Sequence, residues 1–205
     1  MFLRRSISQI PIPALDVIIV GRVAPRETPA FHARRSELFE ERLVYEMTPG
    51  INAAKKARIP YTLHEYEHDP SSESYGMEAA EKLGVPPERV FKTLVVTLDG
   101  KELAVGIIPV DAMLSMKLVA KAAGAKKTVM AQPADVERAT GYVLGGVSPL
   151  GQKKRLRTFI DSSADAFPTI FVSAGRRGLD IELRPDDLKK LTGASSAPLR
   201  QQEGE

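Results

Sequence analysis

The pattern of hydrophobic and polar positions divides the chain into an irregular beginning and a regular remainder. Before residue 47, prolines at positions 11, 13, 25 and 29 interrupt the apolar residues, and the apolar run Val17–Val20 is far shorter than the ~20 residues that span a bilayer. We therefore expect residues 1–46 to be a poorly ordered extension, or a misassigned start with Met47 as the initiator. The folded domain is expected over residues 47–193 and a flexible tail over 194–205.

From residue 47 onward, the chain alternates between patterns typical of helices and of strands. Apolar positions at helical spacing, bounded by capping residues and glycines, predict helices over 48–59, 76–85, 116–124, 133–141 and 184–193. Alternating or continuous apolar runs predict strands near 61–68, 90–98, 101–110, 157–161, 168–174 and 178–183, with an Asp99-Gly100 hairpin turn. Because no regular strand–helix–strand repeat appears, the order favours an α/β fold with a mixed β-sheet flanked by helices.

Composition excludes some chemistry and leaves other kinds open. The chain of 205 residues has no cysteine, which excludes a disulfide framework, a thiolate metal site and a cysteine nucleophile. The net charge is +3, and basic residues cluster at Lys126-Lys127, at 153–157 and at Arg176-Arg177. One such cluster is typical of a solvated surface, but three beside glycine turns favour a polyanionic partner.

A glycine-rich loop precedes one of these clusters, in the segment GGVSPLGQKKR over residues 145–155. A phosphate-binding P-loop requires a lysine directly after its second glycine and then a hydroxyl residue. Here Gln152 follows Gly151, the lysines come later, and Pro149 lacks one of the backbone N–H groups that would cradle phosphate. The segment is therefore not a P-loop, although its glycines can let the backbone approach a ligand closely.

Lys92 is the clearest candidate for chemistry. In the predicted strand, Lys92 shares a face with Leu94 and Val96, where an ammonium is costly unless it reaches water or meets an anion. Two hypotheses stay open: a strand-end lysine whose amine extends to solvent, or an ammonium directed into a cleft to hold a carbonyl, phosphate or carboxylate.

Other polar residues give weaker signals when taken from the pattern alone. His64 and His68 share a strand face with Tyr66 but stand about 13 Å apart at ~3.3 Å per residue, too far to bind one metal ion. Ser148 does not lie in the G-x-S-x-G pattern of a serine hydrolase, and Asp180 shares its face with a glutamate. Pattern alone therefore assigns no metal, no cofactor and no protein nucleophile.

Three separated motifs resemble one known family. The segments FKTLVV, GGVSPLGQKKR and SAGRRGLDIEL, together with the segment that begins MTPGINAAKKARIPY, resemble the YbaK family of bacterial Cys-tRNA(Pro)/Cys-tRNA(Cys) deacylases. This family is related to the editing domain of prolyl-tRNA synthetases. The resemblance covers residues 47–193 and implies the mixed α/β fold of the YbaK/aminoacyl-tRNA synthetase-associated editing domains.

The resemblance also implies roles for particular residues. Lys92 matches the family's essential lysine and is the implied catalytic residue. The implied substrate-binding residues are Tyr66, Tyr75, Gly145, Gly146, Ser148, Ser173 and Asp180. Lys153, Lys154 and Arg155 are expected to contact phosphates of the tRNA.

The activity that the resemblance implies is trans-editing in the cytoplasm, without a cofactor, a metal or a membrane. Cysteine would be removed from mischarged Cys-tRNA(Pro), with Cys-tRNA(Cys) as a further substrate and prolyl-tRNA synthetase as a partner. In this family the thiol of the substrate is thought to attack its own ester, so that the enzyme supplies positioning and charge stabilisation. Two alternatives remain open: an Ala-tRNA(Pro) deacylase that uses water, and a non-catalytic module that binds tRNA or a synthetase.

Overall fold

The computed structural model describes residues 47–72 and 74–201. Its helices are α2 (Pro49–Ala57), α3 (Tyr75–Leu83), α4 (Met116–Ala123), α5 (Pro133–Thr140) and α6 (Pro185–Thr192), with short 3₁₀ segments at Pro87–Arg89 and Ser162–Ala166. Its strands are β1 (Tyr61–Glu65), β2 (Val90–Leu98), β3 (Glu102–Pro109), β4 (Thr128–Met130), β5 (Arg157–Asp161), β6 (Ile170–Arg176), β7 (Leu179–Leu183) and β8 (Ser195–Ala197).

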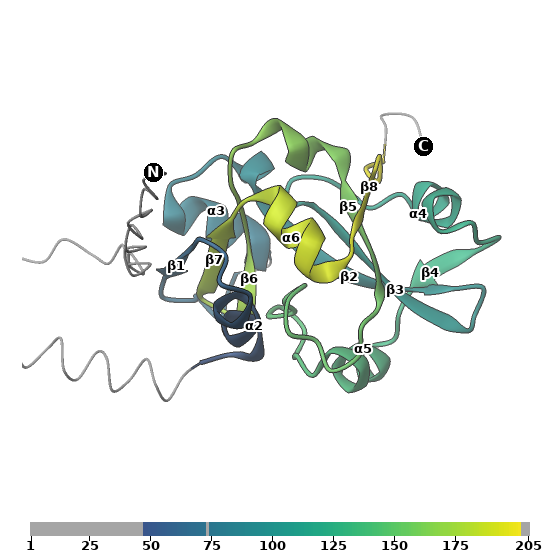
Figure 1. The fold of residues 1–205 in the computed structure, drawn as a ribbon, viewed down its shortest axis with the longest axis horizontal. Helices are drawn as coiled ribbons and strands as arrows, with labels where there is room; N and C mark the ends of the chain where they lie inside the picture. Colours follow the sequence, from purple (N-terminus) through teal and green to yellow (C-terminus); the bar gives the residue numbers. More distant parts are fainter. Residues whose placement is uncertain (1–46, 73, 202–205) are drawn as a thin grey trace, which may run out of the picture.

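The strands form one mixed sheet in the order β1-β7-β6-β2-β3-β5-β8, and β4 pairs with the far end of β2 (Figure 1). The β2–β3 and β6–β7 pairs are antiparallel hairpins, whereas β2–β6, β3–β5 and β5–β8 are parallel. The expected mixed α/β architecture is therefore confirmed.

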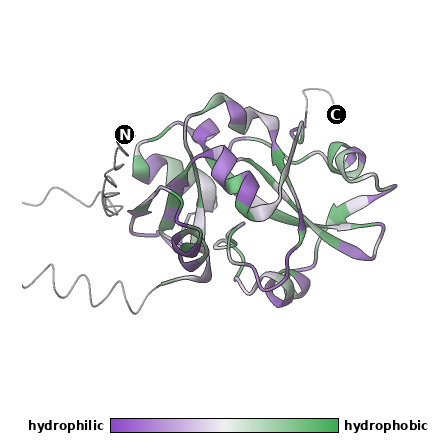
Figure 2. Cartoon of the chain, viewed as in Figure 1, coloured by the Kyte–Doolittle hydropathy of each residue, from purple (hydrophilic) through white to green (hydrophobic). Residues whose placement is uncertain are grey.

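Helices cover both faces of this sheet. The largest buried cluster joins α2, α5 and α6 to one face, through residues such as Ile51, Val136 and Leu188. On the other face, Ala79 and Ala80 of α3 pack on Val90 and Phe171, and α4 packs over the β2–β3 hairpin. Figure 2 shows the hydrophobic colours concentrated on the strands and inward helix faces, with hydrophilic colours along the outer surfaces. In the described part of the chain, no helix combines the length and hydrophobicity needed to cross a bilayer.

The predicted helix boundaries are set by local capping chemistry. Thr48 and Ser74 each accept a hydrogen bond from a backbone N–H in the first turn of α2 and α3, and Ser115 does the same for α4. Gly84 and Gly124 end α3 and α4 in the left-handed conformation, which glycine adopts without a steric penalty.

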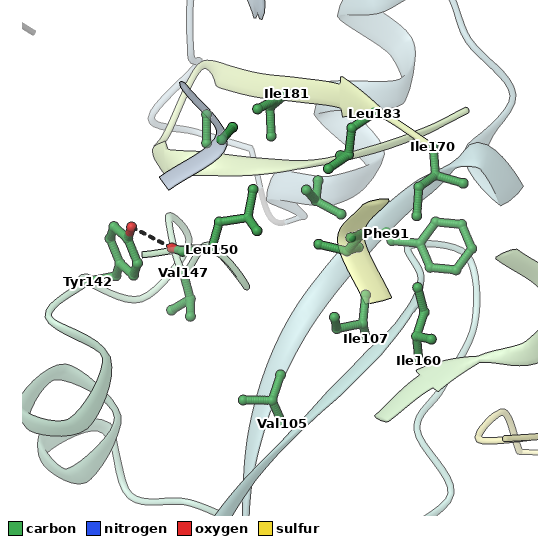
Figure 3. Close-up of a cluster of buried hydrophobic side chains, with 14 of the residues drawn as sticks. Phe91, Val105, Ile107, Tyr142, Val147, Leu150, Ile160, Ile170, Ile181 and Leu183 are labelled. Carbon is green, nitrogen blue, oxygen red and sulfur yellow. Dashed lines mark hydrogen bonds between the residues drawn. The ribbon is translucent and has the colours of Figure 1, made fainter. Parts of the chain in front are cut away.

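The glycine-rich loop is anchored in the main core. Figure 3 shows Val147 and Leu150 among the buried side chains, with the Tyr142 hydroxyl donating a hydrogen bond of 2.7 Å to the Leu150 carbonyl. Tyr142 is only 4% exposed. A buried phenol needs such a partner, so this bond fixes one part of the loop to the domain.

Residues 195–200, which the sequence analysis places in a flexible tail, pair and pack with the rest of the domain in the structure. Strand β8 pairs in parallel with β5, and Leu199 is fully buried. The carboxylate of Asp161 accepts the Leu199 N–H at 2.8 Å and pairs with Arg200 at 3.2 Å. The sequence gives little hint of this, because the segment is short and its strand is completed only by a distant neighbour. Residues 1–46 and 202–205, to which the remaining expectations apply, lie outside the described residues.

Candidate active site

The register of the sheet brings three of the expected residues into one row. Asp180 of β7 stands directly opposite Ser173 of β6, and Phe91 of β2 stands beside Val172. Because side chains alternate along a strand, Lys92, Ser173 and Asp180 all project from the sheet face that α3 covers. The mixed topology thus joins segments separated by about eighty residues of sequence (92 to 173).

A cavity of about 300 Å³ lies over this row. Strands β2, β6 and β7 form its floor, α3 and the segment at Tyr66 form one wall, and the glycine-rich loop forms another. Its lining comprises Tyr66, Ser74, Tyr75, Gly76, Ala79, Val90, Phe91, Lys92, Thr93, Leu94, Val110, Leu144, Gly145, Val147, Ser173, Arg176, Arg177 and Asp180. A mostly apolar cavity with a few convergent polar groups is the usual form of a small-molecule site.

Lys92 lies partly buried in the cavity. Its ammonium donates a hydrogen bond of 3.1 Å to the Val110 carbonyl, at the end of the neighbouring strand β3. Burial lowers the pKa of Lys92, while the negative charge of Asp111 partly offsets this by raising it. A cation held in a poorly solvated site by a neutral carbonyl can still stabilise negative charge that develops on a bound ligand.

Asp180 is buried beside Tyr66. Burial raises the pKa of the Asp180 carboxyl from its ordinary 3.8 to about 7, although a hydrogen bond with Tyr66 lowers it in part. Burial likewise raises the pKa of Tyr66, and the charges of Asp180 and Glu78 raise it further. The Asp180 carboxyl can therefore donate or accept a proton near neutral pH, whereas Tyr66 keeps its proton there.

Tyr75 and the glycine-rich loop meet at the side of the cavity. Gly145 has a φ of 85°, and a Cβ placed there would lie 2.7 Å from the Tyr75 ring. The close approach of the backbone to this ring therefore depends on glycine. The ring is in turn covered by Arg177, whose guanidinium carbon lies 4.6 Å from the ring centroid.

The remaining expected residues lie outside the cavity lining. Ser148 is fully buried, and its hydroxyl accepts the Leu150 N–H at 3.2 Å, which is a structural role within the loop. Gly146 packs against the backbone of Arg176 instead of facing the cavity. Lys153, Lys154 and Arg155 are exposed, and none of them lines the cavity.

Sequence reasoning missed several parts of this site. Arg177 appeared in the pattern only as half of a basic cluster, and Leu144 gave no signal. Glu78 also lacked a signal: it is 6% exposed, and its carboxylate accepts the Asp69 N–H at 2.6 Å and binds the His68 ring at 2.8 Å. Its place on the buried side of α3, under an incoming loop, could not be read from one sequence.

The histidines and carboxylates form polar pairs. His64 bonds to Glu182 at 2.9 Å, just as His68 bonds to Glu78. Across residues 47–72 and 74–201, no three His, Cys, Asp or Glu side chains gather closely enough to hold a metal ion. The polar groups that line the cavity include the Lys92 ammonium, hydroxyls, backbone groups, the Asp180 carboxyl and two arginines, Arg176 and Arg177.

Comparison with known proteins identifies the class of enzyme. The family model for the aminoacyl-tRNA editing domain matches residues 70–191. The chain therefore belongs to the aminoacyl-tRNA editing domain family, a class of aminoacyl-tRNA deacylases. The family expected from the three sequence motifs is thereby confirmed.

Two relatives are similar to this chain over most of its length. The chain is 37% identical over 159 residues to the "Putative Cys-tRNA(Pro)/Cys-tRNA(Cys) deacylase EbsC" of Enterococcus faecalis, covering 77% of this chain and 96% of that protein. It is 29% identical over 142 residues to the uncharacterized protein YwhH of Bacillus subtilis, covering 67% of this chain and 90% of that protein.

Solved structures agree on the fold. A structure described as "a putative trans-editing enzyme for prolyl tRNA synthetase" matches with a TM-score of 0.65 at 23% identity, covering 75% of this chain and 96% of that chain. The hypothetical protein APE2540 matches with a TM-score of 0.68 at 24% identity, covering 75% of this chain and 100% of that chain.

Proposed function

We propose that this protein is a trans-editing deacylase that removes cysteine from mischarged Cys-tRNA(Pro), with Cys-tRNA(Cys) as a further substrate. The observation that carries the proposal is Lys92, which is partly buried in a cavity that Ser173 and Asp180 also line. The similarity to EbsC supports the choice of a cysteinyl substrate. The aminoacyl ester would enter this cavity while the body of the tRNA stays outside.

In this proposal the protein positions the ester and stabilises charge. The Lys92 ammonium would exchange its bond to the Val110 carbonyl for the ester oxygen that becomes negative in the transition state. The Gly145 backbone and the Ser173 hydroxyl would hold the ester in place, and Tyr66 and Asp180 would bind the amino group of the cysteine. Tyr75 would contact the terminal ribose, and Gly146 and Ser148 would support the loop.

The reaction would use the substrate's own nucleophile. The cysteine thiol loses its proton, its sulfur bonds to the ester carbonyl carbon, and the bond from that carbon to the ribose oxygen breaks. The ribose oxygen takes up a proton, so that the products are cysteine thiolactone and tRNA with a free 3′ end. This route suits a cavity whose described residues include no cysteine and no evident nucleophilic pair.

One observation favours a second candidate, an Ala-tRNA(Pro) deacylase. Alanine has no thiol, so a water molecule would have to attack the ester. Asp180 lines the cavity, and burial raises its pKa to about 7, so it could accept the proton of this water near neutral pH. Cavity volume does not separate the two substrates, because a methyl and a thiol differ little in binding energy.

The proposal also concerns partners and location. Aminoacyl-tRNA is the proposed substrate, and prolyl-tRNA synthetase is the proposed source of mischarged tRNA(Pro) and of specificity for that tRNA. The site of action would be the cytoplasm, where the synthetase charges its tRNA. Lys153, Lys154 and Arg155 would contact the tRNA backbone outside the cavity.

The test is deacylation of Cys-tRNA(Pro), Ala-tRNA(Pro) and Pro-tRNA(Pro) by the wild type, by Lys92→Ala and by Lys101→Ala. Lys101 is an exposed lysine at the turn of the same hairpin and serves as the matched control. We expect rapid loss of cysteine only, a fall in kcat/KM of about a hundredfold or more in Lys92→Ala, and no change in Lys101→Ala.

Each other outcome has a distinct meaning. Loss of alanine that depends on Asp180 would replace the cysteine proposal by the second candidate. Tight tRNA binding without turnover of any substrate would make the protein a binding module. Full activity in Lys92→Ala would remove the assigned role of the lysine.

A further inference from the structure

A cationic side chain is fixed at the edge of the cavity by two neutral groups. Arg177 stands in the turn between β6 and β7. It follows a bulge in β6 between Ser173 and Arg176, where the pairing of β6 with β7 shifts register. Its guanidinium lies over the Tyr75 ring and donates a hydrogen bond of 2.9 Å to the Leu144 carbonyl. A bulge re-aims the side chains that follow it, which accounts for an arginine directed across the wall of the cavity.

Arg177 differs from its neighbour in how its charge is balanced. The guanidinium of Arg176 forms an ion pair of 2.8 Å with Glu65. Among residues 47–72 and 74–201, no carboxylate lies within ion-pair distance of Arg177. The Arg177 side chain is exposed, and the groups that it contacts, the Leu144 carbonyl and the Tyr75 ring, are neutral.

Three cationic side chains line the cavity, and Arg176 among them is paired with Glu65. The other two lie in different surroundings. Lys92 lies in the floor and is bonded to a carbonyl, whereas Arg177 lies at the exposed edge and is bonded to another carbonyl. A guanidinium has five N–H donors, and the Leu144 carbonyl uses one of them. The remaining donors can form the paired bonds that an arginine makes with a phosphate.

We propose that Arg177 binds the phosphate on the 5′ side of the terminal adenosine of the aminoacyl-tRNA. The inference rests on the proposed function and adds to it a binding group for the last nucleotide. An ester near Lys92 and a phosphate near Arg177 would fix the nucleotide at both ends. Tyr75 then serves two purposes, because it borders the cavity and holds the guanidinium by a cation–π contact.

This assignment separates two kinds of phosphate contact. Lys153, Lys154 and Arg155 lie outside the cavity lining and can meet only phosphates farther along the tRNA. Arg177 lines the cavity, so it can contact the phosphate nearest the reacting ester. A contact with that phosphate positions the substrate, whereas more distant contacts mainly add salt-dependent affinity.

The experiment compares two small probes, adenosine and adenosine 5′-monophosphate, whose binding is measured directly by calorimetry. The monophosphate carries the phosphate in question and adenosine lacks it. We expect the wild type to bind the monophosphate about tenfold to a hundredfold more tightly than adenosine, the range for hydrogen bonds to a charged group. Arg177→Ala should abolish this difference and leave adenosine binding unchanged. Arg177→Lys should retain part of it.

The control variant is Lys101→Ala, which removes a positive charge at the β2–β3 turn, outside the cavity, and should leave both affinities unchanged. Thermal unfolding of each variant shows whether it folds. Equal weakening of both probes by Arg177→Ala would mean that the arginine only supports Tyr75, and would overturn the inference. Equal binding of both probes to the wild type, or no saturable binding of the monophosphate at millimolar concentration, would overturn it as well. The binding comparison needs no turnover, so it stays informative even if every deacylation assay fails.

Discussion

At the scale of single residues, burial decides which polar groups can take part in chemistry. Asp180 and Glu182 are two positions apart in β7, so their side chains lie on the same face of the strand. The sequence allows both of them to face solvent. In the structure, Asp180 is 6% exposed beside Tyr66, whereas Glu182 bonds to His64 nearer the surface. The difference arises from α3 and the Tyr66 segment, which cover one position of the face and leave the other accessible.

The pH dependence of stability provides a test at Asp180. Its pKa is raised from 3.8 to about 7 in the folded state, so the folded protein holds this proton where the unfolded chain has lost it. The stabilising contribution of this carboxyl is complete below about pH 4 and is lost as the pH rises toward about 7, by at most about 4 kcal/mol. Asp180→Asn should therefore gain stability relative to the wild type as the pH rises.

The measurement is urea unfolding of both proteins at about pH 5 and about pH 8. The free energy of unfolding of Asp180→Asn minus that of the wild type should be more positive at the higher pH. A difference that does not change with pH would show that Asp180 has an ordinary pKa. Tyr66→Phe should raise the pKa of Asp180 further, because the hydrogen bond from Tyr66 lowers it.

Gly145 allows a second test at the residue scale. A side chain there must adopt a φ of 85° and would meet Tyr75 and Arg177 at less than 3 Å. Gly145→Ala should raise KM for the aminoacyl-tRNA about tenfold or more, since the loop or the ring must move. Gly124→Ala is the matched control, because Gly124 also has a positive φ but no atom lies within 4 Å of the added carbon. Similar kinetics for the two variants would mean that the contact with Tyr75 has no role in binding.

At the scale of elements, most helices and strands follow from the local pattern. Capping residues, glycines and the Asp99-Gly100 turn are local signals, and the structure contains the helices and strands that they predict. Strand β1 ends at Glu65, earlier than the predicted 61–68, because after that residue the chain turns toward α3. Strands β4 and β8 were not predicted, since three-residue strands are completed only by their pairing partners.

The C-terminal segment provides a test at this scale. Leu199 is fully buried against the β2–β3 side of the sheet, and Leu199→Ala should lower the free energy of unfolding by about 2–5 kcal/mol. Val129→Ala, at a strand position that is 43% exposed, is the control and should change it by less than about 1 kcal/mol. Chemical denaturation measures both. An unchanged unfolding midpoint in Leu199→Ala would restore the expectation of a flexible tail.

At the scale of the whole molecule, positive charge is distributed over separate surfaces. Lys92 and Arg177 line the cavity, Lys153–Arg155 follow the glycine-rich loop, and Lys126-Lys127 lie near Asp99, at the opposite end of β2. A tRNA that places its 3′ end in the cavity would contact Lys153–Arg155 more readily than Lys126-Lys127.

Salt dependence of tRNA binding tests this distribution. A triple alanine variant of residues 153–155 should bind tRNA more weakly at low salt. Its plot of log Kd against log salt concentration should be less steep by about 2, since each lost phosphate contact removes ~0.7–0.9. The double alanine variant of residues 126–127 is the control and should keep the wild-type slope. Filter binding over a range of salt concentrations gives both slopes, and equal slopes in all three proteins would contradict the assignment of this surface.

The sequence by itself determined the class of the fold, the family and most elements, and it marked Lys92 as the candidate for chemistry. These depend on local rules. Period-two alternation indicates that a lysine lies on an apolar strand face, and capping residues mark where helices begin and end. The tertiary structure alone decided which distant residues share a cavity, that Asp180 is buried, that Arg177 rather than Lys153–Arg155 borders the site, and that residues 195–200 belong to the sheet. The physical reason is that burial and register depend on elements packed from elsewhere in the chain, which no local pattern encodes.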